Sequence, residues 1–231
     1  MKLITDTDFA IDCDIQAPCF QHLTPDEMEL IRGSKTQVLF RKGENLTKQG
    51  AFTSYVLFVT DGLVKQFIEG DGTRNFNFKI IKEGEFIGLS SVFTDKTFQY
   101  SSVALSDTRA FLIEKEVLSS LIQTNGMFGF NFMKRFCNHQ ESFFNTIQSV
   151  VYKQMNGRLA DVLLYLNDFN TEKNKLFTLL SRKDIADFAG LSTESTVKIL
   201  KSLEKDCVIK LEEKNILILN QDLLQKISKN G

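Results

Sequence analysis

The pattern of apolar and polar positions divides the chain into a part made of short strands and a part made of helices. Between Thr36 and Ile113, apolar residues alternate with polar ones over short runs, and glycine-containing turn signals separate the runs. This period-two pattern predicts closely spaced strands, as in a jelly-roll β-barrel. The expected strands are residues 38–40, 55–59, 63–68, 74–81 and 110–113. A purely structural barrel interior and an interior that holds a ligand both stay open.

After Ile113 the apolar spacing becomes helical. A short helix is expected at residues 114–121, a break at Asn125-Gly126, and a long helix at residues 127–151. Six residues of the long helix follow one another at intervals of 3, 4, 3, 4 and 3, the rhythm of a coiled coil. We therefore expect a dimer seam formed by Met133, Phe136, Gln140, Phe143, Ile147 and Val150. The alternative is a helix that buries this stripe against its own barrel.

Residues 181–203 have the pattern of two short helices joined by a tight turn. Ser181 can cap the first helix together with Asp184, Gly190 can adopt the left-handed turn conformation, and Ser192 can cap the second helix. An amphipathic helix is expected before them, at 152–168, and two short strands around a polar turn after them, at 210–219. This order is typical of a winged helix-turn-helix.

The second helix of this motif carries polar residues suited to reading DNA. Glu194, Lys198 and Lys201 are spaced i, i+4 and i+7, so they share one stripe. A carboxylate accepts from cytosine N4, and a cation donates to guanine. The predicted DNA-binding residues are Arg182, Ser192, Thr193, Glu194, Ser195, Val197, Lys198 and Lys201. The alternative is a solvated charged face on an ordinary helical hairpin.

Composition adds little evidence for a nucleic-acid partner. The net charge is −1, and from Lys153 onward 13 Lys and Arg stand against 11 Asp and Glu, so DNA binding rests on the motif. The N-terminus lacks a basic start followed by an apolar stretch, and no apolar run approaches the ~18 residues of a membrane span. The four cysteines are scattered, which favours a reducing compartment. We expect a cytoplasmic protein without a membrane partner.

The order of barrel, long helix and winged helix-turn-helix resembles the Crp/Fnr family of bacterial regulators. Residues 82–93 (KEGEFIGLSSVF) are similar to its Gly-Glu/Asp-Phe-Ile-Gly segment, residues 155–166 (MNGRLADVLLYL) to its Gly-Arg-hydrophobic-Ala helix, and residues 181–204 to its recognition motif. The resemblance implies an α+β fold. It comprises a jelly-roll β-barrel of the cyclic-nucleotide-binding type that senses an effector (1–124), a dimerisation helix and hinge (125–152), and a DNA-binding winged helix-turn-helix (153–231).

By this resemblance the protein regulates transcription. It would bind a near-palindromic operator in double-stranded DNA as a homodimer and contact RNA polymerase. Glu194 matches the glutamate that contacts bases in the family, and Thr193 occupies a specificity-setting position. Lys198 stands where relatives usually carry arginine, so the bidentate fork for guanine is missing.

The same resemblance places doubt on cyclic AMP as the effector. Relatives that bind cyclic AMP hold its ribose and phosphate with a Glu and an Arg-Ser pair, where this chain has Leu89, Gln99 and Tyr100. An anionic phosphate needs cations or several N–H donors, so we expect another, unknown small-molecule effector or a pocket filled by its own side chains. The candidate pocket residues are Phe86, Gly88, Leu89, Ser90, Gln99, Tyr100, Phe143 and Phe144.

No cofactor or metal is expected. Oxygen-sensing relatives hold an iron–sulfur cluster with four cysteines, but Cys13 and Cys19 match only two of these, and Phe111 stands at the barrel position. The only histidines, His22 and His139, give a weak basis for haem.

A cupin-like enzyme would need several histidines in the barrel strands, so no catalytic residue is expected. A protein-docking scaffold is a third class, which the helix-turn-helix argues against.

Overall fold

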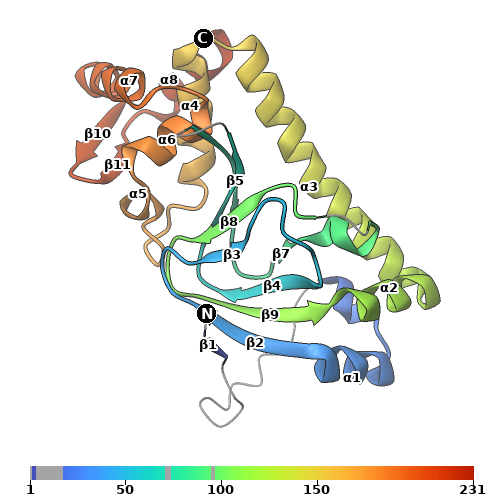
Figure 1. Cartoon of the computed structure of the whole chain (residues 1–231). Coiled ribbons are helices and arrows are strands. Elements are labelled where there is room, and N and C mark those ends of the chain that lie inside the picture. Colours follow the sequence, from blue (N-terminus) through green and yellow to red (C-terminus); the bar gives the residue numbers. More distant parts are fainter. Residues whose placement is uncertain (1, 4–17, 71–73, 95–96) are drawn as a thin grey trace. The chain divides into compact units, whose positions relative to one another are not determined.

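The computed structural model describes residues 2–3, 18–70, 74–94 and 97–231, without the side chains of residues 3, 18 and 139–142. The chain forms two compact units (Figure 1). The first comprises Met1–Ile68 and Lys79–Glu141, and the second comprises Glu69–Phe78 and Ser142–Gly231. None of the described helices is long and apolar enough to cross a membrane.

Two β-sheets form the barrel. Their strand orders are β1-β2-β9-β4-β7 and β3-β8-β5-β6, so β9 lies between β2 and β4 and pairs with both in antiparallel fashion. The bounds are β1 (Lys2–Leu3), β2 (Lys35–Phe40), β3 (Asn45–Thr47), β4 (Tyr55–Asp61), β5 (Val64–Glu69), β6 (Asn75–Ile81), β7 (Phe86–Ile87), β8 (Ser101–Ala104) and β9 (Thr108–Glu114). Apart from the pairs β1–β2 and β5–β6, strands that lie side by side in the sheets are not consecutive in sequence, as in jelly rolls.

The barrel interior is an apolar core supplied by both sheets. Val38 and Val59 come from the five-stranded sheet, and Val64 and Ile81 come from the four-stranded sheet. In β2, the buried Val38 and Phe40 alternate with residues that are exposed or half-buried, which explains the period-two pattern of the sequence. The pattern breaks where residues are buried in succession, at 56–59 in β4, 64–66 in β5 and 80–81 in β6.

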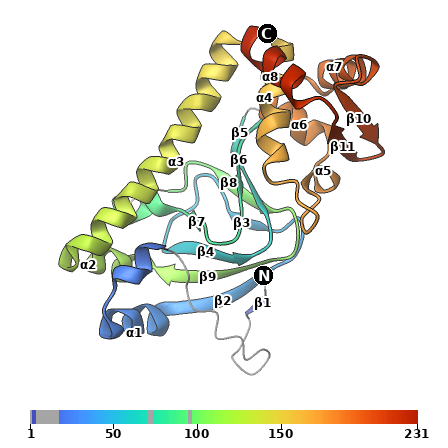
Figure 2. The same cartoon turned by 180° about the vertical axis from the view of Figure 1, so that it is seen from behind.

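A second core explains the continuous burial of β4. It lies among one face of the five-stranded sheet, the 3₁₀ helix η1 (Pro18–His22), α1 (Pro25–Ser34), α2 (Lys115–Thr124) and α3 (Gly126–Tyr152). Both views show α1 and α2 side by side at the end of β2 and β9 (Figures 1 and 2). The aromatic members of this core are Phe20, Phe58, Phe86, Phe111, Phe128 and Phe132. A strand with apolar cores on both faces reads as an unbroken hydrophobic run.

The second unit is a small helical fold with a β-hairpin. It contains α4 (Met155–Asn167), α5 (Leu176–Leu179), α6 (Arg182–Ala189), α7 (Thr193–Lys205), β10 (Ile209–Glu212), β11 (Asn215–Ile218) and α8 (Gln221–Asn230). Helix α4 packs against α6 and α8, and its buried residues include Leu159, Leu163 and Leu166. Strands β10 and β11 pair antiparallel from Ile209↔Ile218 to Glu212↔Asn215.

The predicted α+β architecture is confirmed, with a β-rich N-terminal part, a long helix at 126–152 and a helix-turn-helix followed by a β-hairpin wing. The helices α1, α5 and α8 and the short strands β1, β3, β7 and β8 were not predicted from the sequence. Strands of two to four residues are too short for a period-two pattern to stand out.

Candidate nucleic-acid interface and effector site

Local hydrogen bonds set the boundaries of the two helices of the DNA-binding motif. The Ser181 hydroxyl accepts from the Asp184 N–H at 3.0 Å, and the Asp184 carboxylate accepts from the Ser181 N–H at 2.8 Å, so α6 begins with a capping box. Gly190 ends α6 in the left-handed conformation, with φ at 62°. The Ser192 hydroxyl then accepts from the Ser195 N–H at 3.0 Å and starts α7. These caps lie where the sequence predicts them.

Helix α7 buries one face and exposes the other. Thr196, Leu200 and Leu203 are buried, whereas the exposed side carries four of the predicted DNA-binding residues, Thr193, Glu194, Lys198 and Lys201. Ser192 is also exposed, and Ser195 and Val197 are half-buried. The helix therefore presents a polar surface that begins at its N-terminus.

Glu194 and Lys198 form an ion pair on this surface. Their charged atoms are 2.7 Å apart, and their side chains remain 78% and 74% exposed. An ion pair this exposed contributes little to stability. Breaking this pair therefore costs little, and each side chain can take another partner.

The wing follows α7 directly and is held by two residues outside the hairpin. The Arg182 guanidinium donates to the Glu213 carbonyl at 3.0 Å and to the Lys214 carbonyl at 3.4 Å. The Glu204 carboxylate accepts from the Leu211 N–H at 2.8 Å. The sequence predicts that Arg182 contacts DNA, whereas in the structure its guanidinium donates hydrogen bonds to the wing turn.

Lys214 is exposed at the tip of the wing. Sequence reasoning did not select it, although a lysine in the turn of a predicted wing hairpin was a usable signal. An exposed cation at the tip of a wing can meet a phosphate of the DNA backbone.

Helix α3 carries an exposed apolar stripe in heptad register. Its described members are Phe130, Met133, Cys137, Phe144, Ile147 and Val151. The exposed fractions are 68% for Phe130, 67% for Phe144 and 63% for Val151, which is unusual for large apolar side chains.

The expected dimer seam overlaps this stripe only in part. Met133 and Ile147 lie on it, and the side chain of Gln140 is outside the described residues. Phe136 packs against Phe93, with ring centres 6.0 Å apart, and Phe143 packs against Phe78 at 5.8 Å. Val150 is half-buried. These three residues therefore make contacts within the chain, one helical position away from the exposed stripe.

The glycine of the Phe-Ile-Gly segment meets two aromatic side chains that lie just before strand β8 in the sequence. Gly88 adopts φ of 87°, and its N–H donates to the Tyr100 hydroxyl at 3.1 Å. A Cβ on Gly88 would lie 2.9 Å from the Phe98 ring, so only glycine fits here. Burial raises the pKa of the Tyr100 phenol, which stays neutral. The neighbouring Leu89 is only 4% exposed.

Polar groups inside the barrel satisfy one another. The Thr47 and Ser102 hydroxyls lie 2.8 Å apart, and the Gln66 amide donates to Ser102 at 3.5 Å. Gln66 also hydrogen-bonds the Tyr100 phenol. The Ser101 hydroxyl accepts from the Gln49 N–H at 2.9 Å. Barrel side chains thus fill the hydrogen-bonding capacity of this region themselves.

The remaining candidate pocket residues of the first unit are not gathered around Gly88. Phe86 is 1% exposed and belongs to the aromatic core. Ser90 and Gln99 are exposed, and the Gln99 amide donates to the Thr97 carbonyl at 3.1 Å. Phe143 and Phe144 belong to the second unit. The structure therefore brings together Gly88, Leu89 and Tyr100 from the expected set.

Cys19 is poorly placed to hold an iron–sulfur cluster. Cys19 is 2% exposed, and burial raises the pKa of its thiol to about 11. Phe111 is likewise buried in the core, beneath the Lys35 ammonium at 4.3 Å. Cys13 lies outside the described residues. Within the part of the chain that the structure describes, no group of three or more His, Cys, Asp or Glu side chains could hold a metal ion.

Comparison with known proteins agrees with this architecture. Residues 37–125 match the cyclic nucleotide-binding domain, and residues 157–227 match the Crp-like helix-turn-helix domain. The anaerobic regulatory protein of Bacillus subtilis is 24% identical over 205 residues, covering 86% of each chain. The cyclic AMP receptor protein of Thermus thermophilus is 22% identical over 212 residues, covering 92% of this chain and 97% of that protein.

A solved structure shows the same fold. It is a putative transcriptional regulator of the Crp/Fnr family from Eubacterium rectale, which superposes with a TM-score of 0.77 at 17% identity and covers 92% of this chain and 98% of its own. Both matched domains occur here in the family's order, on either side of a long helix. The chain therefore belongs to the Crp/Fnr family of DNA-binding transcription regulators, which are not enzymes.

Proposed function

We propose that this regulator binds a near-palindromic operator as a homodimer and responds to a signal other than cyclic AMP. The observation that carries the DNA-binding mode is the exposed polar side of α7, which starts at the capped N-terminus and includes Glu194, Lys198 and Lys201. A recognition helix contacts bases with its N-terminal residues. Glu194 accepts from cytosine N4, and Lys198 donates to guanine.

The exposed stripe of α3 supports the homodimer. Phe130, Cys137, Phe144 and Val151 recur every seven residues, and Met133 and Ile147 occupy the second heptad position between them. Such a repeat suits two helices that pack in parallel around each other. We place the seam on these residues together with Gln140. Two subunits related in this way would bring two α7 helices to major grooves about 34 Å apart.

The surroundings of Gly88 support an effector other than cyclic AMP. A cyclic phosphate requires cationic or N–H donors, but here the Gly88 N–H donates to Tyr100 and the Phe98 ring lies over the glycine. Leu89 adds an apolar, buried side chain. An anion at this position would have to displace two aromatic side chains and would meet no cation among Leu89, Gln99 and Tyr100.

The reading role of α7 is tested on an operator selected from random DNA and on a scrambled duplex, each at two salt concentrations. Glu194→Ala should cost about 1–3 kcal/mol on the operator and leave scrambled DNA unaffected, because the contact is to a base. Lys201→Ala should weaken both duplexes alike and reduce the salt slope by about 1, because the contact is to a phosphate.

Glu172→Ala is the matched control for Glu194→Ala. It removes the same charge from an exposed position between α4 and α5, and operator affinity should stay unchanged. Equal weakening of both duplexes by Glu194→Ala would show that Glu194 does not read a base. If neither α7 variant changes binding, α7 is not the recognition helix.

A further inference from the structure

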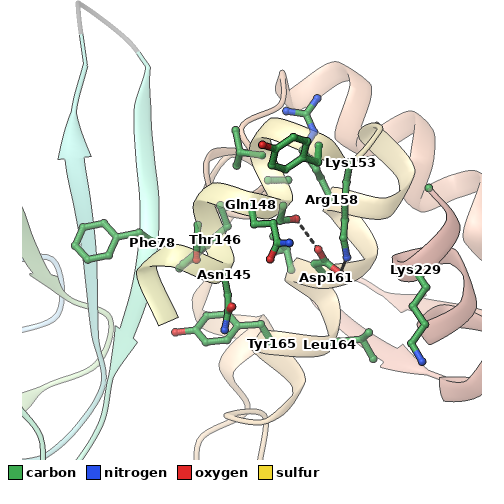
Figure 3. A pocket seen from close by; sticks show the side chains of 17 residues that line it. Phe78, Asn145, Thr146, Gln148, Lys153, Arg158, Asp161, Leu164, Tyr165 and Lys229 are labelled. Carbon is green, nitrogen blue, oxygen red and sulfur yellow. Dashed lines mark hydrogen bonds and ion pairs between the residues drawn. The ribbon is translucent and has the colours of Figure 1, made fainter. Parts of the chain in front are cut away.

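A cavity of about 790 Å³ lies within the second unit. The last turns of α3 line it together with α4, the end of α6 and the end of α8, and Phe78 also contributes (Figure 3). This volume is typical of sites that hold small organic molecules.

The lining combines a large apolar wall with several cations. The apolar side chains are Phe78, Val150, Val162, Leu164, Tyr165 and Phe188. The charged side chains are Lys153, Arg158 and Lys229, with Asp161 as the carboxylate. The balance of these four groups is positive.

Asp161 does not neutralise the whole cavity, because its oxygens are already occupied. The Lys153 ammonium lies 2.8 Å from its Oδ1, and hydroxyls of Ser149 and Ser228 donate to the same carboxylate. Figure 3 shows Lys153 and Asp161 meeting on one side of the cavity. Lys153 and Asp161 balance each other, which leaves Arg158 and Lys229 as cations that no other side-chain carboxylate of the lining neutralises.

Arg158 has a donor that nothing in the described part of the chain satisfies. Its Nε atom is buried and has no hydrogen-bond partner there, and no described carboxylate forms an ion pair with its guanidinium. A Cβ on Gly190 would lie 3.8 Å from its Nη1, so the guanidinium lies at the C-terminal end of α6. A buried donor without a partner is costly, and native proteins usually satisfy it with a ligand, ion or water.

We propose that this cavity binds a small organic anion, a carboxylate or sulfonate attached to an aromatic or aliphatic body. The acidic group pairs with Arg158, whose planar fork suits such oxygens, and Lys229 adds a second positive charge. The apolar body lies against Val162, Tyr165 and Phe188.

The position of the cavity gives such a ligand a means of control. It touches both α3 and α4, which join at Lys153-Gln154, so it stabilises one orientation of α4 against the end of α3. The α3 residues that line the cavity, among them Ser149 and Val150, are not part of the proposed seam. An influence on operator affinity rests on the proposed function, whereas ligand binding itself does not.

Two fluorescent probes with one aromatic body test the site. 1-Anilinonaphthalene-8-sulfonate carries an anion, and N-phenyl-1-naphthylamine is its neutral counterpart. Arg158→Gln should raise the Kd of the anionic probe at least tenfold, the effect of one lost charge-assisted hydrogen bond, and change that of the neutral probe less than threefold. Val162→Phe, which fills the cavity, should weaken both. Lys201→Gln, which removes a cation outside the cavity, should change neither.

Competition on the unaltered protein covers the case in which Arg158→Gln does not fold. Decanoate should displace the anionic probe at a concentration at least tenfold lower than decanol does. Equal displacement by the two, or an unchanged anionic-probe Kd in folded Arg158→Gln, would overturn the proposal. Neither measurement involves DNA, so its failure is distinct from a failure of operator binding.

Discussion

The backbone N–H of Gly88 donates to the Tyr100 hydroxyl across the barrel, over 3.1 Å. Twelve residues separate the two in sequence, and the contact occupies the backbone donor of a residue expected to line the effector pocket. Since Gln66 also bonds the phenol, Tyr100 belongs to the hydrogen-bond network of Thr47 and Ser102. The barrel interior is therefore closed by its own side chains at this point.

Cyclic AMP should bind this protein more weakly than a Kd of roughly 10 μM, about −7 kcal/mol. The reason is that Leu89, Gln99 and Tyr100 offer no cation to the phosphate. Titration calorimetry checks this, and tighter binding would contradict it. A triple variant, Leu89→Glu with Gln99→Arg and Tyr100→Ser, should gain affinity because it restores the missing groups and frees the Gly88 N–H.

Changing both Phe144 and Ile147 to Glu should convert the dimer into a monomer that loses operator affinity. Both side chains lie on the exposed stripe of α3, so the charges would face the partner helix. Sedimentation velocity measures the change. Asn138→Glu, an exposed position beside the stripe, should leave the dimer intact. A dimer that survives the double change would place the interface elsewhere.

Arg182 and Lys214 should separate into a structural role and a DNA-binding role. Arg182→Ala removes the two hydrogen bonds to the wing turn, so the free energy of unfolding should fall by about 1–3 kcal/mol. Lys214→Ala should leave stability unchanged and reduce the salt slope of DNA binding by about 1, because an exposed wing cation meets a phosphate. Urea unfolding and salt-dependent DNA titrations distinguish the two. If Arg182→Ala weakens DNA binding and leaves the free energy of unfolding unchanged, Arg182 belongs to the DNA interface instead.

Cys19 should make the protein less stable as the pH rises from about 9 to about 11. Burial raises the pKa of its thiol from 9.0 to about 11, so the folded state keeps a proton that the unfolded chain has released. The thiol then contributes a loss of up to about 1.4 kcal/mol per pH unit. Urea unfolding at pH 8, 9 and 10 measures this slope. Cys19→Ala should make this pH dependence of stability flatter, whatever the variant's stability at pH 8. An equal slope in both proteins would show that the Cys19 thiol is not its source.

Local chemistry made the DNA-binding motif readable from the sequence. Ser181 and Asp184 cap each other across three residues, Gly190 provides the left-handed turn, and Ser192 caps α7. Each of these interactions involves neighbours in the chain, so residue type and spacing suffice to predict them. The same kind of signal is present at Thr24 and Glu27, which form the capping box of α1, a helix that was not predicted.

Tertiary structure alone decided which face of α3 is buried. Phe128, Phe132 and Phe136 pack into the aromatic core, while Phe130, Met133 and Cys137 stay exposed. Apolar side chains lie on several sides of α3, so two neighbouring stripes fit a seven-residue repeat. Only packing against the sheet and η1 decides which stripe is buried and which stays exposed.

The same holds for contacts between distant residues. Arg182 meets wing carbonyls 31 and 32 residues away, and the Asp161 carboxylate meets Ser228 across 67 residues. Sequence spacing carries no information about such pairs, since the chain path between them depends on the packing of whole helices. The sequence determined the motif and the class of protein, whereas the fold decided which charged groups stay exposed on α7 and that the Arg158 Nε has no partner among the described residues.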